Sequence, residues 1–461
     1  MLKKLRYSFL LFCLIAYFNA NCVAASLSAK INSIISAKGL RSVDFGIVIA
    51  EADSGKVIYS RNSKKPLTPA SNMKLLTSAA ALKYLSSDYK FETSVALAGD
   101  KLVIIGSGDP LFGVNFEKSE PDDSIFDKIS DALKNADVNE VNGIIVDSTI
   151  FDDNRAHPNW PVGQLNRSYA CEVSGLNFNA NCLKIRARKA GKSVTLTTVP
   201  KTSYVKLVNK VKPSGKGGIG SYRSTVPNNI TVYGRCSKAE SFNVAIERPA
   251  AFFGIYLAEK LAASGITVSG QLSEQKAAHL NLEPLLTFET PITDVMKRCN
   301  TDSFGLAAES LLKTIGAKMI MGGADGSWKS GAMAATNYLN SLGISPDEYV
   351  IDDGSGLSAE NKLSANLLSK TILDIYKSGD WLFFRNTLAI GGADGTIRRY
   401  FRTSKYKGKV FAKTGYIKGV RSLSGVCIKD SKTYVFSILA NKANGKTKVA
   451  IHNIVKAVMD N

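Results

Sequence analysis

Two β-hairpin patterns lie at opposite ends of this chain. Near the start, two apolar runs flank the turn sequence Ala-Asp-Ser-Gly at 52–55, and near the end two more flank residues 429–432. Residues 447–459 then read as a closing helix. Hairpins at both ends with helices beside them predict a single α/β domain, built by both termini around one antiparallel sheet. The middle of the chain is then an insertion.

The middle of the chain, from about residue 92 to 285, has a different pattern of apolar and polar residues. It carries short alternating runs such as 102–105 and 194–197, glycine turns and few long helical patterns. We therefore expect a mostly β accessory region. Its glycine-rich stretch at 215–221 lacks the spacing of a nucleotide-binding loop, so no cofactor is expected.

The N-terminus has the pattern of a secretory signal peptide. Basic residues at 3, 4 and 6 precede an apolar core at 7–18, and small residues follow at 23–25. The core is too short for a comfortable membrane span. We expect residues 1–25 to be removed and the mature protein to be exported to the periplasm or another extracytoplasmic part of the envelope.

The net charge is +20, of which the first 25 residues contribute three. Such a balance suits an anionic envelope and allows peripheral association with it. The charges read as scattered, with no basic helix, and export argues against nucleic acid as a partner.

The cysteines and histidines limit the classes of metal site and catalytic site that the chain could form. The mature chain keeps an odd number of cysteines, which are Cys171, Cys182, Cys236, Cys299 and Cys427. They show no Cys-x-x-Cys or Cys/His spacing that would predict a metal site. A Cys171–Cys182 bridge stays open. The only histidines are His157, His279 and His452, which disfavours a Ser-His-Asp hydrolase. A serine nucleophile here would more naturally use a lysine as its base.

Ser71 stands three residues before Lys74, at the head of the apolar run 75–85. The run predicts a helix buried on most sides, and residues three apart share a helix face, so the hydroxyl and the amine could meet. The alternative is that Ser71 only caps the helix. Spacing alone does not decide, because the Ser-x-x-Lys pattern recurs at Ser87, Ser203, Ser273, Ser310 and Ser404.

Two later motifs complete an ordered set. Residues 410–416 read as a strand that ends in Lys413-Thr414-Gly415, and Ser303 precedes a helical stretch at 306–313. Ser-x-x-Lys, a serine before a helix and Lys-Thr-Gly on a strand occur in this order in penicillin-recognising serine acyl-enzymes. Each motif is weak alone, but the ordered set is specific.

The resemblance extends beyond these motifs. The chain is similar to the D-alanyl-D-alanine carboxypeptidase/endopeptidase family, the class C low-molecular-mass penicillin-binding proteins. The similarity covers nearly the whole mature chain, and the stretches that carry it include PLTPASNMKLLTSAAAL within 45–94, LVIIGSGDP at 102–110, IDDGSGLS at 351–358, LAIGGADGTIRR at 388–399 and FAKTGYIKGVRSLSG at 411–425.

This resemblance implies an α/β fold with a penicillin-binding, serine β-lactamase-like transpeptidase domain and a mostly β insertion of two subdomains. The implied catalytic domain comprises residues 26–91 and 285–461. The implied accessory domain comprises 92–111 and 166–284, with 112–165 as a second, nested domain.

The resemblance also implies roles for the motif residues. Ser71 would attack the carbonyl of a terminal D-Ala-D-Ala bond, with Lys74 as the base and Ser303 relaying a proton to the leaving amine. Lys413, Thr414 and Gly415 would bind the substrate carboxylate. The backbone N–H groups of Ser71 and Tyr416 would form the oxyanion hole. The implied partners are peptidoglycan stem peptides and, as covalent inhibitors, β-lactams; no metal is implied.

The second motif departs from the family pattern. Gly305 stands where the family usually has asparagine, so hydrogen bonds worth about 0.5–1.5 kcal/mol each would be missing. Asn300 or Asp302 could reach in instead. We expect an active but slow enzyme whose acylation accelerates in Gly305→Asn and collapses in Ser303→Ala.

Other readings remain open at this point. A β-lactamase shares the motifs, and a catalytically weak or inactive protein of the same fold could bind the cell wall. Asp353, Gly354 and Gly356 are expected to shape a turn near the cleft, whereas Arg398 and Arg399 could line an anionic substrate path or only a solvated face. The sequence leaves open the balance of carboxypeptidase and endopeptidase action, and the oligomeric state.

Overall fold

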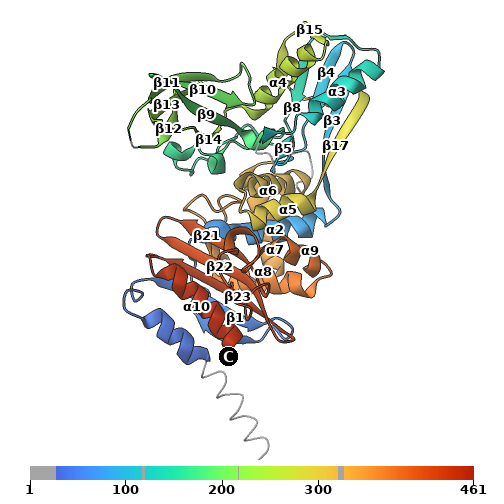
Figure 1. Cartoon of the computed structure of the whole chain (residues 1–461). Coiled ribbons are helices and arrows are strands. Elements are labelled where there is room, and N and C mark those ends of the chain that lie inside the picture. Colours follow the sequence, from blue (N-terminus) through green and yellow to red (C-terminus); the bar gives the residue numbers. More distant parts are fainter. Residues whose placement is uncertain (1–26, 117–119, 216, 320–325) are drawn as a thin grey trace, which may run out of the picture. The chain divides into compact units, whose positions relative to one another are not determined.

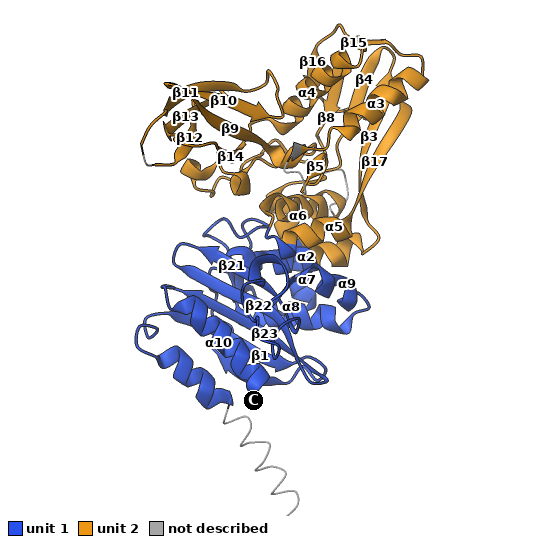
Figure 2. Cartoon of the chain, viewed as in Figure 1, with its two compact units in different colours: residues 1–79, 300–303, 335–461 blue, residues 80–299, 304–334 orange. Residues whose placement is uncertain are grey.

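The computed structural model describes residues 27–116, 120–215, 217–319 and 326–461 (Figure 1). The predicted signal peptide, residues 1–25, lies outside this range. The chain forms two compact units (Figure 2). Unit 1 comprises the chain up to residue 79 together with 300–303 and 335–461, and unit 2 comprises 80–299 and 304–334. The boundaries predicted for the catalytic and accessory domains stay a prediction.

A six-stranded sheet forms the centre of unit 1. Its strand order is β2-β1-β23-β22-β21-β20, and every neighbouring pair is antiparallel. The strands are β1 (Asp44–Glu51), β2 (Val57–Arg61), β20 (Ala389–Ile390), β21 (Val410–Ile417), β22 (Val420–Lys429) and β23 (Lys432–Asn441). Both hairpins predicted from the sequence are present, and β1 pairs with β23, so the prediction that the termini share one sheet is confirmed.

Helices cover the two faces of this sheet (Figure 1). The closing helix α10 (Thr447–Asp460) and the helical residues 27–36 pack with Ile47, Ile438 and other strand residues into one apolar core. Helix α8 (Ala365–Lys377) contacts β1, β22 and β23. Because both faces are covered, consecutive residues of β1 such as Ile47 and Val48 are both buried.

Shorter elements complete unit 1. They are the 3-10 turns at Ala70–Asn72, Pro346–Glu348 and Gly395–Ile397, the strands β18 (Tyr349–Val350) and β19 (Lys362–Leu363), and the helix α9 (Trp381–Thr387). Three helices contain residues of both units, because the division of the chain falls within them: α2 (Met73–Leu85), α5 (Ile292–Thr301) and α7 (Trp328–Ser341). Helix α2 matches the apolar helix predicted over 75–85.

Unit 2 contains a five-stranded mixed sheet in the order β16-β8-β4-β3-β17. Its strands are β3 (Lys90–Ala98), β4 (Lys101–Ile105), β8 (Ile144–Asp147), β16 (Leu272–Glu274) and β17 (Glu283–Pro291). The helices α3 (Ser124–Asn135) and α4 (Pro249–Ala263) contribute buried aromatic rings to its core, including Phe126, Phe252 and Phe253.

Two three-stranded sheets form most of the remaining β structure of the insertion. One has the order β10-β9-β14, with β9 (Cys182–Ala190), β10 (Ser193–Val199) and β14 (Glu240–Ala245). The other has the order β11-β13-β12, with β11 (Lys206–Lys212), β12 (Ile219–Arg223) and β13 (Asn229–Arg235). Short pairs join β15 (Thr267–Val268) to β7 (Glu140–Val141) and β5 (Val114–Asn115) to β6 (Glu120–Pro121).

The insertion is mostly β, as expected, and it also contains the helices α3 and α4. Helix α4 is apolar on nearly all sides and begins with Pro249, a residue suited to the first helical turn. An apolar run without clear periodicity fits a buried helix as well as a buried strand. The sequence reading of this segment therefore missed α4. Helix α6 (Gly305–Met319), predicted over 306–313, also belongs to unit 2.

Candidate active site

Ser71 lies in the 3-10 turn Ala70–Asn72 that leads into α2. Lys74 follows one helical turn later, with 2% of its surface exposed. Its Nζ donates a hydrogen bond to the Ser71 hydroxyl at 3.3 Å. The hydroxyl thus faces the amine, which favours a nucleophile and its base over the capping alternative.

A second contact fixes the Lys74 amine. Nζ donates to the backbone carbonyl of Ser355 at 2.7 Å. The loop that carries this carbonyl is organised by the fully buried Asp353, whose carboxylate accepts from the N–H groups of Gly356 and Ser358, both at 2.7 Å, and from the Asn361 amide at 2.7 Å. Sequence reasoning expected a turn here but missed Ser355, because a backbone carbonyl leaves no residue-type signal.

Gly356 brings this loop against the nucleophile turn. Its φ is +77°, and a Cβ at this position would lie 1.8 Å from the carbonyl oxygen of Ala70. Ala70 itself has a φ of 47°, in the left-handed region that costs a residue with a side chain about 1 kcal/mol or more. The backbone directly before Ser71 is therefore held in an unfavourable conformation by its surroundings, as is typical of functional sites.

Lys413 is fully buried in β21 and forms the second lysine–serine pair of unit 1. Its Nζ donates to the Ser303 hydroxyl at 2.8 Å and to the Thr414 carbonyl at 3.0 Å. Ser303 has a φ of 64°, a second left-handed residue among the predicted site residues. The structure therefore brings two residues of the ordered motifs together that are far apart in the sequence.

The other residues of the third motif continue along β21. Thr414 donates its hydroxyl proton to the Thr396 hydroxyl at 3.0 Å. A Cβ on Gly415 would lie 2.6 Å from the Pro69 carbonyl oxygen, so glycine lets β21 approach the turn that carries Ser71. Tyr416 is 62% exposed, and the Arg421 guanidinium lies 3.6 Å from the centre of its ring.

Asn300 and Asp302 are not equivalent substitutes for the missing asparagine. Asn300 is fully buried and uses both ends of its amide: Oδ1 accepts from Ser78 at 3.2 Å, and Nδ2 donates to the Thr387 hydroxyl at 2.9 Å. It therefore ties the end of α5 to its neighbours. At Gly305, a Cβ would lie 3.1 Å from the Tyr169 carbonyl oxygen, so a side chain there needs a small shift of that carbonyl.

Asp302 is exposed and lines a hollow of about 290 Å³. The hollow is also lined by Thr396, the hydrogen-bond partner of Thr414, and by Arg398 and Arg399. These exposed arginines lie at a hollow one contact away from the third motif, and an anionic substrate path along them stays a prediction.

Within the described residues, no group of three or more His, Cys, Asp or Glu side chains could hold a metal ion. Cys171 and Cys182 are both buried and are not bridged. In the same part of the chain, no helix combines the length and hydropathy needed to cross a bilayer.

Comparisons with known proteins place the chain in the family that its sequence resembles. Residues 27–460 match the D-Ala-D-Ala carboxypeptidase 3 (S13) family. A D-alanyl-D-alanine carboxypeptidase from Actinomadura sp. is 27% identical over 412 residues, which cover 80% of this chain and 72% of that protein.

Solved structures extend the comparison to the fold. Penicillin binding protein 4 from Haemophilus influenzae superposes with a TM-score of 0.81 at 20% identity, covering 93% of this chain and 99% of its own. The same protein in complex with a β-lactam gives a TM-score of 0.75 at 19% identity, with 92% and 98% covered. A peptidoglycan endopeptidase from Bdellovibrio bacteriovorus gives 0.53 at 15% identity, with 91% and 93% covered.

Proposed function

Because this chain belongs to the D-Ala-D-Ala carboxypeptidase 3 (S13) family of serine-type peptidases, we propose that it is exported and removes terminal D-alanine from peptidoglycan stem peptides through an acyl-enzyme at Ser71. The observation that carries this proposal is the pair of lysine–serine contacts in unit 1, Lys74 with Ser71 and Lys413 with Ser303.

In the first step, the Ser71 hydroxyl adds to the carbonyl of the D-Ala-D-Ala bond and passes its proton to a neutral Lys74 amine. Burial disfavours the charged form of an amine, and the Ser355 carbonyl holds the amine in place beside Ser71. The backbone N–H groups of Ser71 and Tyr416 stabilise the negative charge that develops on the carbonyl oxygen.

In the second step, the carbon–nitrogen bond breaks as the leaving amine takes a proton from the Ser303 hydroxyl, and the proton that Lys74 received from Ser71 passes to Ser303 and restores its hydroxyl. The hydrogen bond that Lys413 Nζ donates to this hydroxyl supports the role, since it stabilises the oxygen that loses the proton. Lys413 and Thr414 bind the carboxylate of the terminal D-alanine, and Gly415 leaves room for β21 beside the nucleophile turn. Water then releases the acyl group and regenerates Ser71.

β-Lactams would enter the same cycle as covalent inhibitors that acylate Ser71. The β-lactam complex of the Haemophilus protein, whose fold this chain shares, supports this part of the proposal. The signal-peptide pattern at residues 1–25 supports export to the compartment that holds peptidoglycan.

Cleavage of peptide cross-links is a second candidate activity. The fold is also that of a protein described as a peptidoglycan endopeptidase, and the arginine-lined hollow near Thr396 offers space next to the residues that would bind the carboxylate. Both activities use the same acyl-enzyme and differ only in the leaving amine.

The test is release of D-alanine from a soluble pentapeptide that ends in D-Ala-D-Ala, with a cross-linked muropeptide dimer in parallel. We expect wild-type protein to release D-alanine and Ser71→Ala to release none. Rapid hydrolysis of penicillin without D-alanine release would identify a β-lactamase instead. A folded wild-type protein that neither forms an adduct nor releases D-alanine would identify a binding protein on this fold.

A further inference from the structure

The three-stranded sheet β11-β13-β12 of unit 2 has one face packed inside the unit and one face open to solvent. Its inner face contributes Val211 and Ile219 to an apolar cluster with residues of β9 and β10, including Ala187 and Val194. Successive side chains of a strand point to opposite faces of the sheet, so the residues between these inner positions lie on the outer face. The outer face therefore points away from β9 and β10.

Two tyrosines lie next to each other on this outer face. Tyr222 of β12 is in register with Thr231 of β13, and Tyr233 of β13 is in register with Gly220 of β12. The two ring centres are 5.7 Å apart, with 42° between the ring planes. The tyrosines are 46% and 47% exposed, and within the part of the chain that the structure describes neither hydroxyl has a hydrogen-bond partner.

Gly220 allows the ring of Tyr233 to lie across the sheet. A Cβ on this glycine would be 2.8 Å from both Cζ and the hydroxyl oxygen of Tyr233, so the ring passes over Gly220 towards Tyr222. Thr231, on the same face, is only 5% exposed. The two rings thus form a shallow aromatic surface. We call it, together with the adjacent Lys210, the tyrosine face: Lys210, Gly220, Tyr222, Thr231 and Tyr233.

Positive charge borders the tyrosine face. Lys210 of β11 is in register with Tyr233, and residues in register share a face of the sheet. Lys212 is in register with Arg235 in the next row of the same face, and all three cations are exposed. Residues 206–235, which form the three strands and their connections, contain no Asp or Glu. The tyrosine face therefore attracts anions.

The wider segment Cys182–Ala245, which contains both three-stranded sheets, holds most of the excess positive charge of the chain. Its 64 residues include 13 Lys and Arg but one acidic residue, Glu240, so this segment accounts for +12 of the total of +20. The expectation that the charges are scattered is wrong. Counted along the whole chain, the bias was diluted by the more balanced remainder.

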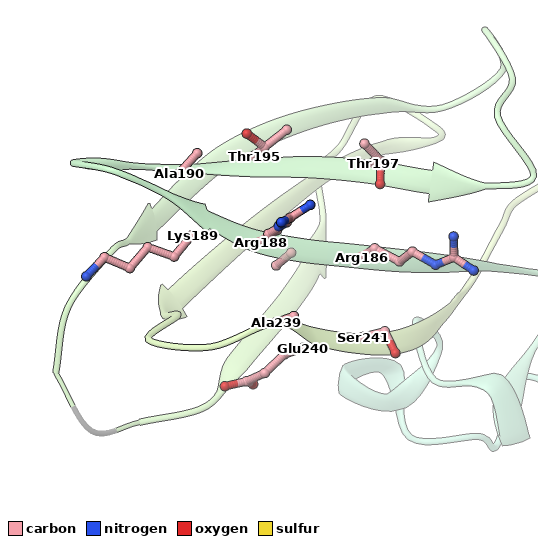
Figure 3. Close-up of a pocket in the computed structure, with 10 residues that line it drawn as sticks. Arg186, Arg188, Lys189, Ala190, Thr195, Thr197, Ala239, Glu240 and Ser241 are labelled. Atoms are coloured by element: carbon pink, nitrogen blue, oxygen red, sulfur yellow. The ribbon is translucent and has the colours of Figure 1, made fainter.

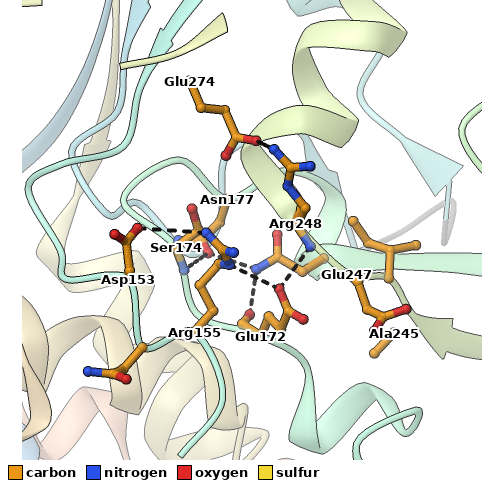
Figure 4. A network of polar contacts seen from close by, with 12 residues as sticks. Asp153, Arg155, Glu172, Ser174, Asn177, Ala245, Glu247, Arg248 and Glu274 are labelled. Atoms are coloured by element: carbon orange, nitrogen blue, oxygen red, sulfur yellow. Dashed lines mark hydrogen bonds and ion pairs between the residues drawn. The ribbon is translucent and has the colours of Figure 1, made fainter. Parts of the chain in front are cut away.

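The inward side of β12 has a structural role instead. Arg223, directly after Tyr222, lies within 4 Å of both Glu172 and Glu247. These carboxylates belong to a polar network in which the backbone N–H of Arg248 donates to Glu172 at 2.8 Å (Figure 4). The inward side chain of this strand is thus tied to the fold, whereas the neighbouring tyrosine ring is presented to solvent.

The neighbouring sheet β10-β9-β14 presents a different surface. It carries a hollow of about 740 Å³ that is lined by cations, hydroxyl groups and Glu240 (Figure 3). Among the described residues that line this hollow, none has an aromatic ring. The combination of exposed rings and cations is therefore a property of the tyrosine face and not of both sheets.

We propose that the tyrosine face binds the glycan chain of peptidoglycan. The proposal rests on the proposed function, because that function makes this polymer the substrate. The C–H bonds of a sugar ring carry a small positive charge and pack on the negative face of an aromatic ring. The tyrosine hydroxyls can exchange hydrogen bonds with sugar hydroxyls, and Lys210 and Lys212 attract the carboxylates that the polymer bears.

Two observations favour a sugar chain as the occupant. The rings form a shallow surface rather than a closed pocket, which suits the flat faces of successive sugar rings. Single-stranded nucleic acid also stacks on aromatic rings beside cations, but the signal-peptide pattern at residues 1–25 argues against that partner. An enzyme that holds its polymeric substrate outside the catalytic residues stays near further cleavage sites between turnovers.

The experiment measures sedimentation of the full-length mature protein with purified, insoluble peptidoglycan. All proteins carry Ser71→Ala, so that turnover does not alter the polymer. The test variant carries Tyr222→Thr and Tyr233→Thr, which remove both rings and introduce a residue suited to strands. The matched control carries Tyr222→Phe and Tyr233→Phe, which keep both rings at the same positions.

We expect the threonine variant to bind about tenfold more weakly than the parent, as the loss of two ring contacts of modest strength would give, and the phenylalanine variant to bind within about twofold of it. Glycan chains freed of their stem peptides should displace the parent from the insoluble polymer, whereas free stem peptides should not. Formation of the penicillin adduct at Ser71, measured with the same tyrosine substitutions in the wild-type background, should be unchanged.

Gly220→Ala is a second variant that removes no aromatic group. Its Cβ crowds the end of the Tyr233 ring and displaces it from the sheet, so we expect binding to weaken by about threefold. If the threonine variant does not fold, this variant decides the question, and binding at the parent level would then overturn the proposal.

Binding of the threonine variant at the parent level would overturn the proposal, as would equal losses in the threonine and phenylalanine variants or a parent that does not sediment with the polymer. Displacement by free stem peptides or by a single-stranded oligonucleotide, but not by glycan chains, would assign the surface to another ligand. Failure of the proposed function is visible separately, because it would abolish the penicillin adduct in all proteins that retain Ser71 and leave the binding measurement intact.

Discussion

Lys413 Nζ donates a hydrogen bond of 2.8 Å to the hydroxyl of Ser303, a residue held at a φ of 64°. A left-handed serine costs about 1–2 kcal/mol relative to a relaxed conformation, and such strain persists where the surrounding structure imposes it. This pairing makes Ser303 the strongest candidate for the proton relay to the leaving group.

Removing the Ser303 hydroxyl tests that role. We expect acylation by benzylpenicillin to slow by about a hundredfold or more in Ser303→Ala, because general acid–base groups contribute on that scale. Stopped-flow or quenched acylation kinetics provide the measurement. Ser303→Gly is the control, since glycine relieves the backbone strain but also lacks the hydroxyl. Acylation at the wild-type rate in Ser303→Gly would show that the hydroxyl has no catalytic role.

Gly305 tests the departure from the family pattern. The Tyr169 carbonyl crowds any side chain at this position, so Gly305→Asn has a steric cost that Gly305→Ala shares. We expect Gly305→Asn to acylate faster than Gly305→Ala by up to about tenfold, the value of one hydrogen bond supplied by the amide. Equal rates in the two variants would mean that an asparagine amide has no function in this site.

Gly356 tests the packing of the Asp353 loop against the nucleophile turn. Gly356→Ala should lower the free energy of unfolding by about 2–4 kcal/mol, because it adds left-handed strain and an overlap with the Ala70 carbonyl. Gly419→Ala is the control: its φ is +76°, but the space around it is open, so about 1 kcal/mol is expected. Urea unfolding gives both values, and similar losses in the two variants would contradict the close contact.

Asp109 predicts a pH dependence of stability in unit 2. Burial raises the pKa of its carboxyl to about 6, although Thr290 and the N–H of Leu111 donate hydrogen bonds to it. A raised pKa means that the folded protein binds this proton more tightly than the unfolded chain does. The stability that Asp109 contributes is therefore present below about pH 4 and is lost as the pH rises through about 6.

Asp109→Asn should accordingly be more stable than wild type at about pH 7.5, by about 2–3 kcal/mol, with the difference vanishing near pH 4. Urea unfolding at a series of pH values provides the measurement. The exposed Asp131 supplies the control, since Asp131→Asn should leave the pH profile unchanged. A constant difference between Asp109→Asn and wild type across this range would rule out the titration of Asp109.

The parts of the fold that the sequence predicted well are those with local signals. Alternating strands with turn residues at 52–55 and 429–432 specified both hairpins, and the apolar run after Ser71 specified α2. Helix α4 was not predicted, because its residues are apolar on nearly all sides and their hydrophobicity therefore shows no helical period. The pairing of β11 with β13, which is parallel, depends on contacts between distant residues that local patterns do not encode.

The candidate site divides in the same way. The motifs identified Ser71, Lys74, Ser303 and Lys413 by residue type and order. The carbonyl of Ser355, the left-handed φ of Ala70 and the use of Asn300 as a buried brace are backbone and packing features. They arise only once the chain is folded, so residue types alone do not predict them.

The central claim is that Ser71 is the nucleophile. Its most direct test is the intact mass of the protein after incubation with benzylpenicillin, followed by peptide mapping of any adduct. Ser87 begins another Ser-x-x-Lys sequence and supplies the matched control. We predict one added penicillin in wild type and in Ser87→Ala, mapped to Ser71, and none in Ser71→Ala. An adduct on another serine, or a folded wild-type protein without any adduct, would contradict the account.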